Sequence, residues 1–134
     1  MLGILIVSHS EDAARGIEQI AAAMAGEGYV EIRGVGGNDD GGLGVSVSKI
    51  HDALLLLLTK TENIIIIPDL GSSVLSSRGA IGMLSQEETE RVVIADVPTL
   101  EGAMLAAVEA SGGSSVEQIV KAAEEARHLK KLDH

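Results

Sequence analysis

The 134-residue chain contains no cysteine, tryptophan or phenylalanine, and its only aromatic residue is Tyr29. Without cysteine it can form neither a disulfide nor a thiolate metal site, and it has no thiol nucleophile. Without aromatic rings it has no platform on which a base or a flavin could stack. Thiol chemistry is therefore excluded, aromatic stacking is disfavoured, and the core has to be aliphatic.

Basic residues are also scarce, because 10 lysines and arginines stand against 20 aspartates and glutamates. The net charge of −10 would repel phosphate backbones and anionic membranes. The longest apolar runs, Leu54 to Leu58 and Ile64 to Ile67, are far shorter than the roughly 20 residues of a membrane span. With no signal pattern before the first apolar run, we expect a cytoplasmic protein with neither a nucleic-acid nor a membrane partner.

Apolar runs of strand length alternate with helical patterns along the whole chain, which is typical of a parallel sheet built from β-α-β units. The length fits a single α/β domain over residues 1–134. Strands are predicted at residues 3–7, 29–35, 63–67 and 91–95. Helices are predicted after the N-cap Ser10 and at residues 44–60, 72–84, 99–111 and 115–129.

Apolar residues at intervals of three and four predict which face of each early helix packs on the sheet. In the first helix these residues are Ala13, Ile17, Ile20, Ala21 and Met24. In the second helix they are Val47, Ile50, Leu54, Leu57 and Leu58. The leucine run of the second helix is wide enough to leave spare apolar surface for a dimer contact.

The strands differ in how far they are covered. The first and third are continuous apolar runs, which indicates central strands with both faces buried. The second alternates apolar residues with Glu31 and Arg33, as an edge strand does. Right-handed crossovers then predict an open four-stranded parallel sheet in the order 2-1-3-4, with helices on both faces. Ligands of such sheets bind where the winding reverses, outside the carboxyl ends of the first and third strands.

Two candidate reactive residues lie at that point, because His9 follows the first strand and Asp69 follows the third. Neighbouring strands lie about 4.8 Å apart, so the two side chains can touch. A carboxylate that holds one imidazole nitrogen fixes the tautomer and leaves the other nitrogen as a nucleophile. We predict that His9 is the nucleophile and Asp69 its orienting acid. The alternative is that each residue only terminates or caps a local element.

The chemistry that this pair could perform is narrowed by missing motifs. No G-x-S-x-G elbow and no H-E-x-x-H is present, so acyl transfer and zinc hydrolysis lack their usual parts. Phosphoryl transfer needs an in-line nucleophile and donors for the phosphoryl oxygens. Helix N-termini supply such donors, here Ser10, Gly71, Ser72 and Ser73. The scarcity of cations suits a carrier that must also release the group.

The glycine-rich loop at residues 34–44 is not a nucleotide-binding motif, because Asp39 replaces the last glycine of G-x-G-x-x-G and no G-K-[ST] follows. A turn of tight glycines is the simplest interpretation, and Mg²⁺ coordination is a weaker one. A third is a rim that contacts a partner protein through Gly37, Asp40 and Gly41. The remaining histidines are predicted to be surface residues and not metal ligands: His51, His128 and His134.

Four segments, in order along the chain, resemble a known family: I-L-I-V-S-H-S at 4–10, G-G-N-D-D-G-G-L-G at 36–44, D-L-G-S at 69–72 and V-P-T-L-E-G-A at 97–103. The family is the phosphocarrier subunit of phosphoenolpyruvate-dependent dihydroxyacetone kinase, whose domain belongs with the mannose-type IIA components of the sugar phosphotransferase system. Two departures concern secondary contacts. The family's G-T-S is Gly44-Val45-Ser46 here, and an asparagine often seen after the third segment is replaced around Ser76 and Ser77.

The resemblance implies a phosphotransferase subunit in which His9 is phosphorylated by the small histidine phosphocarrier HPr. The group would then pass to ADP held with Mg²⁺ on the L subunit of the kinase, whose partner K subunit binds dihydroxyacetone. This chain would therefore need no cofactor or metal of its own. The resemblance also implies a homodimer, a parallel sheet ordered 2-1-3-4, and Asp69 as the acid beside the histidine.

Two alternatives stay open. A mannose-type IIA component would pass the group from His9 to a sugar transporter. A receiver-like signalling module would bind Mg²⁺ through Glu11 and Asp12 and accept the phosphoryl group on Asp69. That module also needs a fifth strand ending in lysine, and the sequence pattern predicts neither.

Overall fold

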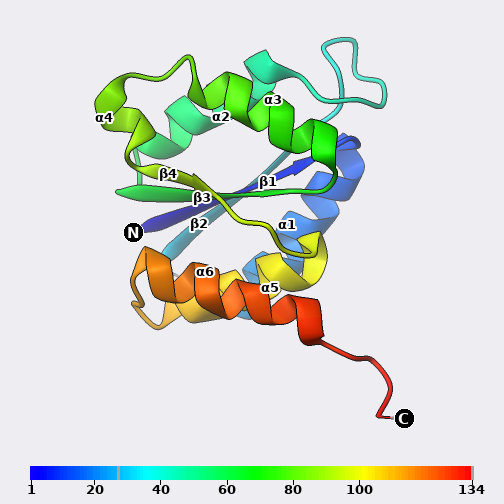
Figure 1. Cartoon of the computed structure of the whole chain (residues 1–134), viewed down its shortest axis with the longest axis vertical. Helices are drawn as coiled ribbons and strands as arrows, with labels where there is room; N and C mark the ends of the chain where they lie inside the picture. The colour runs from blue at the N-terminus through cyan, green and yellow to red at the C-terminus, as the bar shows by residue number, and fades with distance from the viewer. Residues whose placement is uncertain (27, 134) are drawn as a thin grey trace.

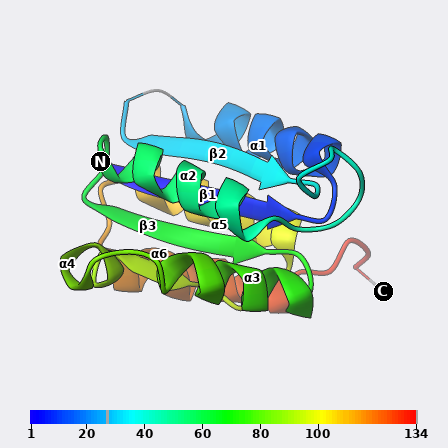
Figure 2. The ribbon, with the colours of Figure 1, turned by 90° about the horizontal axis from the view of Figure 1, so that it is seen from above.

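Four strands form one parallel sheet in the computed structural model of the chain, which describes residues 1–26 and 28–133. The strands are β1 (Leu2–Ser8), β2 (Val30–Gly36), β3 (Asn63–Pro68) and β4 (Val92–Ile94). They lie in the order β2-β1-β3-β4, so the predicted topology is confirmed. The strand ends differ from the predicted ones by at most one residue. Figure 2 looks onto the sheet, with the labelled strand arrows pointing the same way.

Helices cover both faces of the sheet (Figure 1). One layer contains α2 (Val47–Leu58), α3 (Gly71–Ile81) and α4 (Gln86–Thr89), and the other α1 (Glu11–Ala25), α5 (Thr99–Ser111) and α6 (Val116–Glu124). The short helix α4 was not predicted, and a Ser85–Glu88 capping box begins it. The last predicted helix ends early, at Glu124, and continues as one 3-10 turn, Glu125–His128.

The alternation of side chains along β1 divides the core into two parts. Ile4 and Ile6 pack with the alanines of α1 and α5, whereas Leu5 and Val7 pack with the large side chains of α2. All four are completely buried, which explains the continuous apolar sequence of this strand. The predicted core face of α2 is confirmed except at Val47, which is 37% exposed.

The predicted core face of α1 is largely wrong. Of the predicted residues, Ala13, Ile20 and Met24 are exposed, Ile17 is half-buried, and Ala21 is fully buried together with Ala14 and Ala25. The cause is a close approach to β2, because a Cβ added to Gly34 would lie 2.4 Å from the Ala14 carbonyl oxygen. Only small side chains fit such a contact, so the larger apolar residues face away from it.

The sheet brings the segments after β1 and β3 to one edge. Val7 pairs with Pro68, and the Asp69 N–H donates to the Val7 carbonyl oxygen at 2.9 Å. The end of β2 packs equally closely on this edge, because a Cβ on Gly36 would lie 2.6 Å from the Ser8 carbonyl oxygen. The residues that follow β1 and β3 are thus placed side by side.

In the part of the chain that the structure describes, there is no helix with the length and apolar character that crossing a bilayer requires.

Candidate functional site

His9 and Asp69 lie in direct contact at the carboxyl edge of the sheet, as the strand order predicted. The Asp69 carboxylate accepts the His9 backbone N–H through Oδ2 at 2.9 Å, and its Oδ1 lies 3.1 Å from Nδ1 of the imidazole. Both oxygens of one carboxylate therefore hold the same residue. Its main chain and its ring are fixed together.

The two imidazole nitrogens have different surroundings. Nδ1 faces the Asp69 carboxylate, which can only accept, so Nδ1 carries the proton. Nε2 is then left with its lone pair, and the Ser72 hydroxyl donates to it at 2.7 Å. The His9 side chain is 29% exposed and the contact with Ser72 lies at the surface. The nucleophilic nitrogen is the one that a partner can reach.

Ser73 lies on the inner side of this pair and is completely buried. Its hydroxyl donates to Oδ1 of Asp69 at 2.5 Å and lies 3.3 Å from Nδ1 of His9. The sequence predicts Ser73 as a donor to a phosphoryl oxygen. The structure places it beneath the carboxylate instead, because the first turn of α3 directs position 73 towards the core.

Asp69 is held in its charged form. Burial raises the pKa of its carboxyl, but hydrogen bonds from the Ser73 hydroxyl and from the backbone and ring of His9 outweigh burial and lower it to about 2. The carboxylate is therefore negative at neutral pH. A fixed negative charge beside Nδ1 stabilises the positive charge that the ring acquires when Nε2 forms a bond.

The other predicted donors lie at the N-termini of two helices. Ser10 is the N-cap of α1, as predicted, and its Oγ accepts the Ala13 N–H at 3.1 Å. At the start of α3, the N–H groups of Gly71 and Ser72 have no hydrogen-bond partner among the described residues. The Ser72 hydroxyl contacts Nε2, and the two N–H groups at the same helix start can bind an anion.

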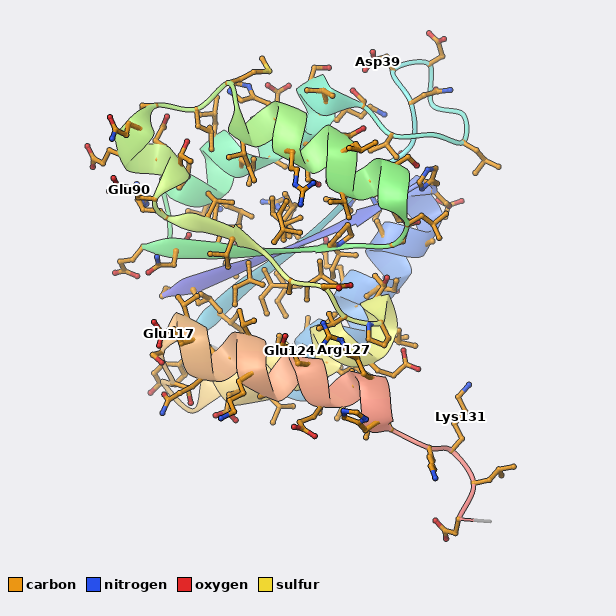
Figure 3. The ribbon with its side chains drawn as sticks, in the orientation of Figure 1. Asp39, Glu90, Glu117, Glu124, Arg127 and Lys131 are labelled. Atoms are coloured by element: carbon orange, nitrogen blue, oxygen red, sulfur yellow. The ribbon has the colours of Figure 1, made fainter. Side chains whose placement is uncertain are left out.

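The glycine-rich loop folds back onto His9. The Gly44 N–H donates to the His9 carbonyl oxygen at 2.8 Å, and Gly37 and Gly41 have φ of 82° and 87°, which favours glycine. Asp39, labelled on this loop in Figure 3, accepts hydrogen bonds from the hydroxyl groups of Ser46 and Ser48. The loop is thus held by its own hydrogen bonds, and Asp40 is exposed on it.

No group of three or more histidines, cysteines or carboxylates that could hold a metal ion occurs within residues 1–26 and 28–133. His51 is half-buried on α2 and His128 is exposed, whereas His134 lies outside the described residues.

Sequence analysis missed two contacts that shape the site. One is the Gly44 N–H on the His9 carbonyl, and the other is the Ser8 hydroxyl, which accepts the Ser10 N–H at 3.1 Å. The Gly44 contact has no signal in the sequence, because it depends on where the loop returns to the sheet, whereas the Ser8 contact is local and joins residues two apart. The sequence shows the loop glycines as a motif, but it does not show that the loop contacts His9.

Known proteins match this sequence and fold over most of the chain. Residues 3–120 match the family model described as the PTS system fructose IIA component. The chain is 36% identical over 121 residues to "PEP-dependent dihydroxyacetone kinase 2, phosphoryl donor subunit DhaM" of Listeria innocua, covering 90% of this chain and 95% of that protein. It is 35% identical over 132 residues to a DhaM phosphoryl donor subunit of Providencia stuartii, covering 97% of this chain but only 28% of the longer relative.

Solved structures agree. The crystal structure of EF1359, a protein of unknown function, superposes with a TM-score of 0.83 at 34% identity and covers 92% of this chain and 93% of that one. A phosphotransferase system component EIIA from Streptococcus agalactiae has a TM-score of 0.69 at 19% identity, covers 96% and 93% of the two chains, and shows the shared fold. With residues 3–120 matched, the chain belongs to the phosphotransferase system IIA family described as the PTS system fructose IIA component.

Proposed function

We propose that this protein is a phosphoryl carrier that accepts a phosphoryl group on Nε2 of His9 and passes it to a second protein. One observation supports this most strongly. Asp69 and Ser73 hold Nδ1 from the inner side, while Nε2 lies beside Ser72 and the start of α3. An orienting carboxylate, here half-buried, and an accessible nitrogen are the two requirements of a histidine nucleophile.

The transfer step follows from this geometry. The Nε2 lone pair attacks the phosphorus of a phosphohistidine on the donor, a new N–P bond forms, and the donor's N–P bond breaks with its electron pair returning to the donor imidazole. The Ser72 hydroxyl turns from Nε2 to a phosphoryl oxygen. The N–H groups of Gly71 and Ser72 donate hydrogen bonds to none of the described residues and are free to donate to the other oxygens.

The absence of cations around His9 favours release of the phosphoryl group. Within the described residues, no lysine or arginine hydrogen-bonds to His9 or Asp69. Strong binding of the phosphoryl group in the ground state would slow its departure, so weak neutral donors suit a carrier better than cations do. The proposal is that of a phosphotransferase subunit that completes no reaction alone.

We propose HPr as the donor, and ADP with Mg²⁺ on the L subunit of dihydroxyacetone kinase, with its K subunit, as the acceptor. The support is the match to relatives described as phosphoryl donor subunits of that kinase, one of which is covered over 95% of its length. This chain then needs no cofactor, and its place is the cytoplasm with those partners. The second candidate is a IIA component that feeds a sugar transporter, which the family's description favours.

We also propose a homodimer. Two apolar surfaces are available for a second copy. Leu55 and Leu56 of α2 are 38% and 44% exposed. The edge strand β4 exposes Val93 beside an apolar hollow of about 310 Å³ that is lined by Val116 and Val120 of α6. Analytical ultracentrifugation of the wild type, Leu56→Asp and Val93→Asp tests whether a dimer forms and which surface it uses. A wild type that is monomeric at micromolar concentration would contradict the homodimer.

The test uses phosphoenolpyruvate, enzyme I and HPr. We expect one acid-labile, base-stable phosphate on the wild type and none on His9→Ala. Equal labelling of the two proteins, or no labelling of the wild type, contradicts the carrier. A base-labile acyl phosphate would instead support the receiver-like alternative on Asp69.

Addition of the K and L subunits with ADP, Mg²⁺ and dihydroxyacetone should then produce dihydroxyacetone phosphate from phosphorylated protein. Discharge that requires a membrane transporter component, and never occurs to the L subunit, would replace the kinase with the sugar-transport alternative.

A further inference from the structure

Three side chains of the site form a continuous chain of hydrogen bonds: Ser72, His9 and Asp69. The Ser72 hydroxyl lies 2.7 Å from Nε2 of His9, and Nδ1 of the same ring lies 3.1 Å from Oδ1 of Asp69. A hydroxyl, an imidazole and a carboxylate in this order have the connectivity of the catalytic triad of serine hydrolases. Such triads recur on unrelated folds and are recognised by geometry, so the missing G-x-S-x-G motif does not exclude one here.

The imidazole of His9 is arranged as a base for the Ser72 hydroxyl. Because Nδ1 carries the proton and faces the Asp69 carboxylate, Nε2 has a lone pair and can take the hydroxyl proton. The negative charge of Asp69 stabilises the imidazolium that then forms. The Ser73 hydroxyl and the His9 backbone N–H hold that carboxylate in place. The Ser72 oxygen is therefore activated as a nucleophile by its neighbour.

The start of α3 supplies both this nucleophile and donors for a developing negative charge. Ser72 is exposed, so a small molecule can reach its oxygen. The N–H groups of Gly71 and of Ser72 itself have no hydrogen-bond partner among the described residues. Such N–H groups stabilise the oxyanion that forms when a hydroxyl adds to a carbonyl carbon, and in serine hydrolases the nucleophile's own N–H contributes. One short segment thus provides two parts of an acyl-transfer site.

A hollow beside the three side chains indicates the size of acyl group that the site accepts. It has a volume of about 400 Å³, and Asp69 is one of the residues that line it. Val74 and Val97 contribute apolar lining, and the exposed residues Arg78 and Asp96 line it as well. A chain of a few carbon atoms fits this volume and would contact the two valines. The hollow therefore favours short acyl groups.

We propose that the side chains of Ser72, His9 and Asp69 hydrolyse small activated esters of short carboxylic acids. In the first step Nε2 takes the Ser72 proton, the Ser72 oxygen bonds to the carbonyl carbon, and the ester C–O bond breaks. The alcohol leaves with the electron pair of that bond and with the proton from Nε2. In the second step Nε2 takes a proton from water, whose oxygen bonds to the acyl carbon. The carboxylic acid leaves, and the Ser72 oxygen regains the proton from Nε2.

This activity goes beyond the proposed phosphoryl transfer and uses the same nitrogen. A phosphoryl group on Nε2 occupies the lone pair that the base needs, so the phosphorylated protein should not hydrolyse esters. This mutual exclusion rests on the proposed function. The hydrolysis itself does not, because it is measured without enzyme I, HPr or phosphoenolpyruvate.

The experiment measures release of p-nitrophenolate from p-nitrophenyl acetate and p-nitrophenyl butyrate by the purified protein. We expect repeated turnover, and a rate lower by about tenfold or more in Ser72→Ala and in His9→Ala. The matched control is Ser76→Ala, which changes a half-buried serine of the same helix that makes no hydrogen bond to His9 and should keep the wild-type rate. Mass spectrometry after an acid quench should locate the acyl group on Ser72.

Three results would overturn the proposal. One is a wild-type rate in folded Ser72→Ala with loss of activity in His9→Ala, because the imidazole itself would then attack the ester. The second is a wild-type rate no higher than that of free imidazole at the same concentration. The third is an acyl group on a residue other than Ser72.

A final measurement adds phosphoenolpyruvate, enzyme I and HPr. Ester hydrolysis should fall in proportion to the phosphate bound, and an unchanged rate in fully phosphorylated protein would contradict the shared use of Nε2. A protein that hydrolyses esters but accepts no phosphate would contradict the proposed function alone, so the two failures are distinguishable.

Discussion

A network of hydrogen bonds lies at each end of the sheet, and the two networks differ in whether they leave a reactive atom exposed. At the end where the strands begin, the Arg91 guanidinium donates to the carbonyl oxygens of Leu58, Thr61 and Glu62. At the end where they finish, Asp69 and Ser73 hold His9. The first network terminates on main-chain carbonyls. The second holds the His9 ring so that Nε2, which carries a lone pair, lies at the surface.

This difference shows why a cluster of charged residues does not by itself mark a functional site. Arg91 donates hydrogen bonds to carbonyl groups at the C-terminal end of α2 and in the turn before β3, so its contacts stabilise the fold. The contacts of Asp69 instead orient a neighbour whose reactive nitrogen they leave free. Variants at the two ends should therefore separate stability from phosphoryl transfer.

The largest effect is expected from Asp69→Asn. The amide cannot supply the negative charge that stabilises the phosphorylated ring, and partners of this kind typically contribute about 10–100-fold. We expect the rate of His9 phosphorylation to fall by that factor while far-ultraviolet circular dichroism stays unchanged. A wild-type rate would show that the carboxylate only caps α3, as our local alternative has it.

Arg91→Ala is expected to have the complementary effect at the other end of the sheet. Loss of a charged donor to three carbonyl groups should lower the free energy of unfolding by about 2 kcal/mol. Urea denaturation measures the loss, and phosphorylation per folded molecule should match the wild type. An altered transfer rate in fully folded protein would contradict the separation of the two ends.

Two buried serines on α3 sharpen the comparison further. The Ser73 hydroxyl donates a hydrogen bond to Asp69, whereas the Ser77 hydroxyl, equally buried, has no hydrogen-bond partner among the described residues. We expect Ser73→Ala to destabilise the protein by about 1 kcal/mol and to slow phosphorylation several-fold. Ser77→Ala should be neutral or slightly stabilising, because it removes an unpaired polar group. If the two variants changed stability and phosphorylation rate equally, Ser73 would have no specific role in the site.

The smallest expected effect is a dependence of stability on acid. The pKa of Asp69 is lowered from its ordinary value of 3.8 to about 2, so the charged form stabilises the fold above 3.8 and that contribution is lost as the pH falls towards 2. The full shift corresponds to about 2 kcal/mol, and because solvent screens this half-buried carboxylate, we expect the difference in unfolding free energy between wild type and Asp69→Asn to shrink by about 1 kcal/mol over this window. A difference that stays constant between pH 5 and pH 2 would contradict the hydrogen bonding assigned to this carboxylate.

The fold could be predicted well because its signals are long and repeated. The isoleucine run of β3 and the alternation in β2 were enough to place one strand at the centre and the other at the edge. That order in turn placed His9 beside Asp69. Here the topology, and not any single motif, located the candidate site.

The predictions that were wrong or incomplete concern close packing and burial of side chains. The core face of α1 was misjudged because the prediction favoured Ile20 and Met24, while the contact with β2 admits only alanine beside Gly34. The burial of Ser73 was not predicted, because the sequence does not show which way the first turn of α3 faces. Both errors involve close approaches between elements, which periodicity does not encode.

The central claim is that Nε2 of His9 accepts the phosphoryl group while Nδ1 stays bonded to Asp69. The most direct test is nuclear magnetic resonance of protein labelled with ¹⁵N in histidine and phosphorylated by enzyme I and HPr. We expect ³¹P coupling to Nε2 of His9 and a proton retained on Nδ1. Coupling to Nδ1, or phosphate on any other residue, would contradict this account.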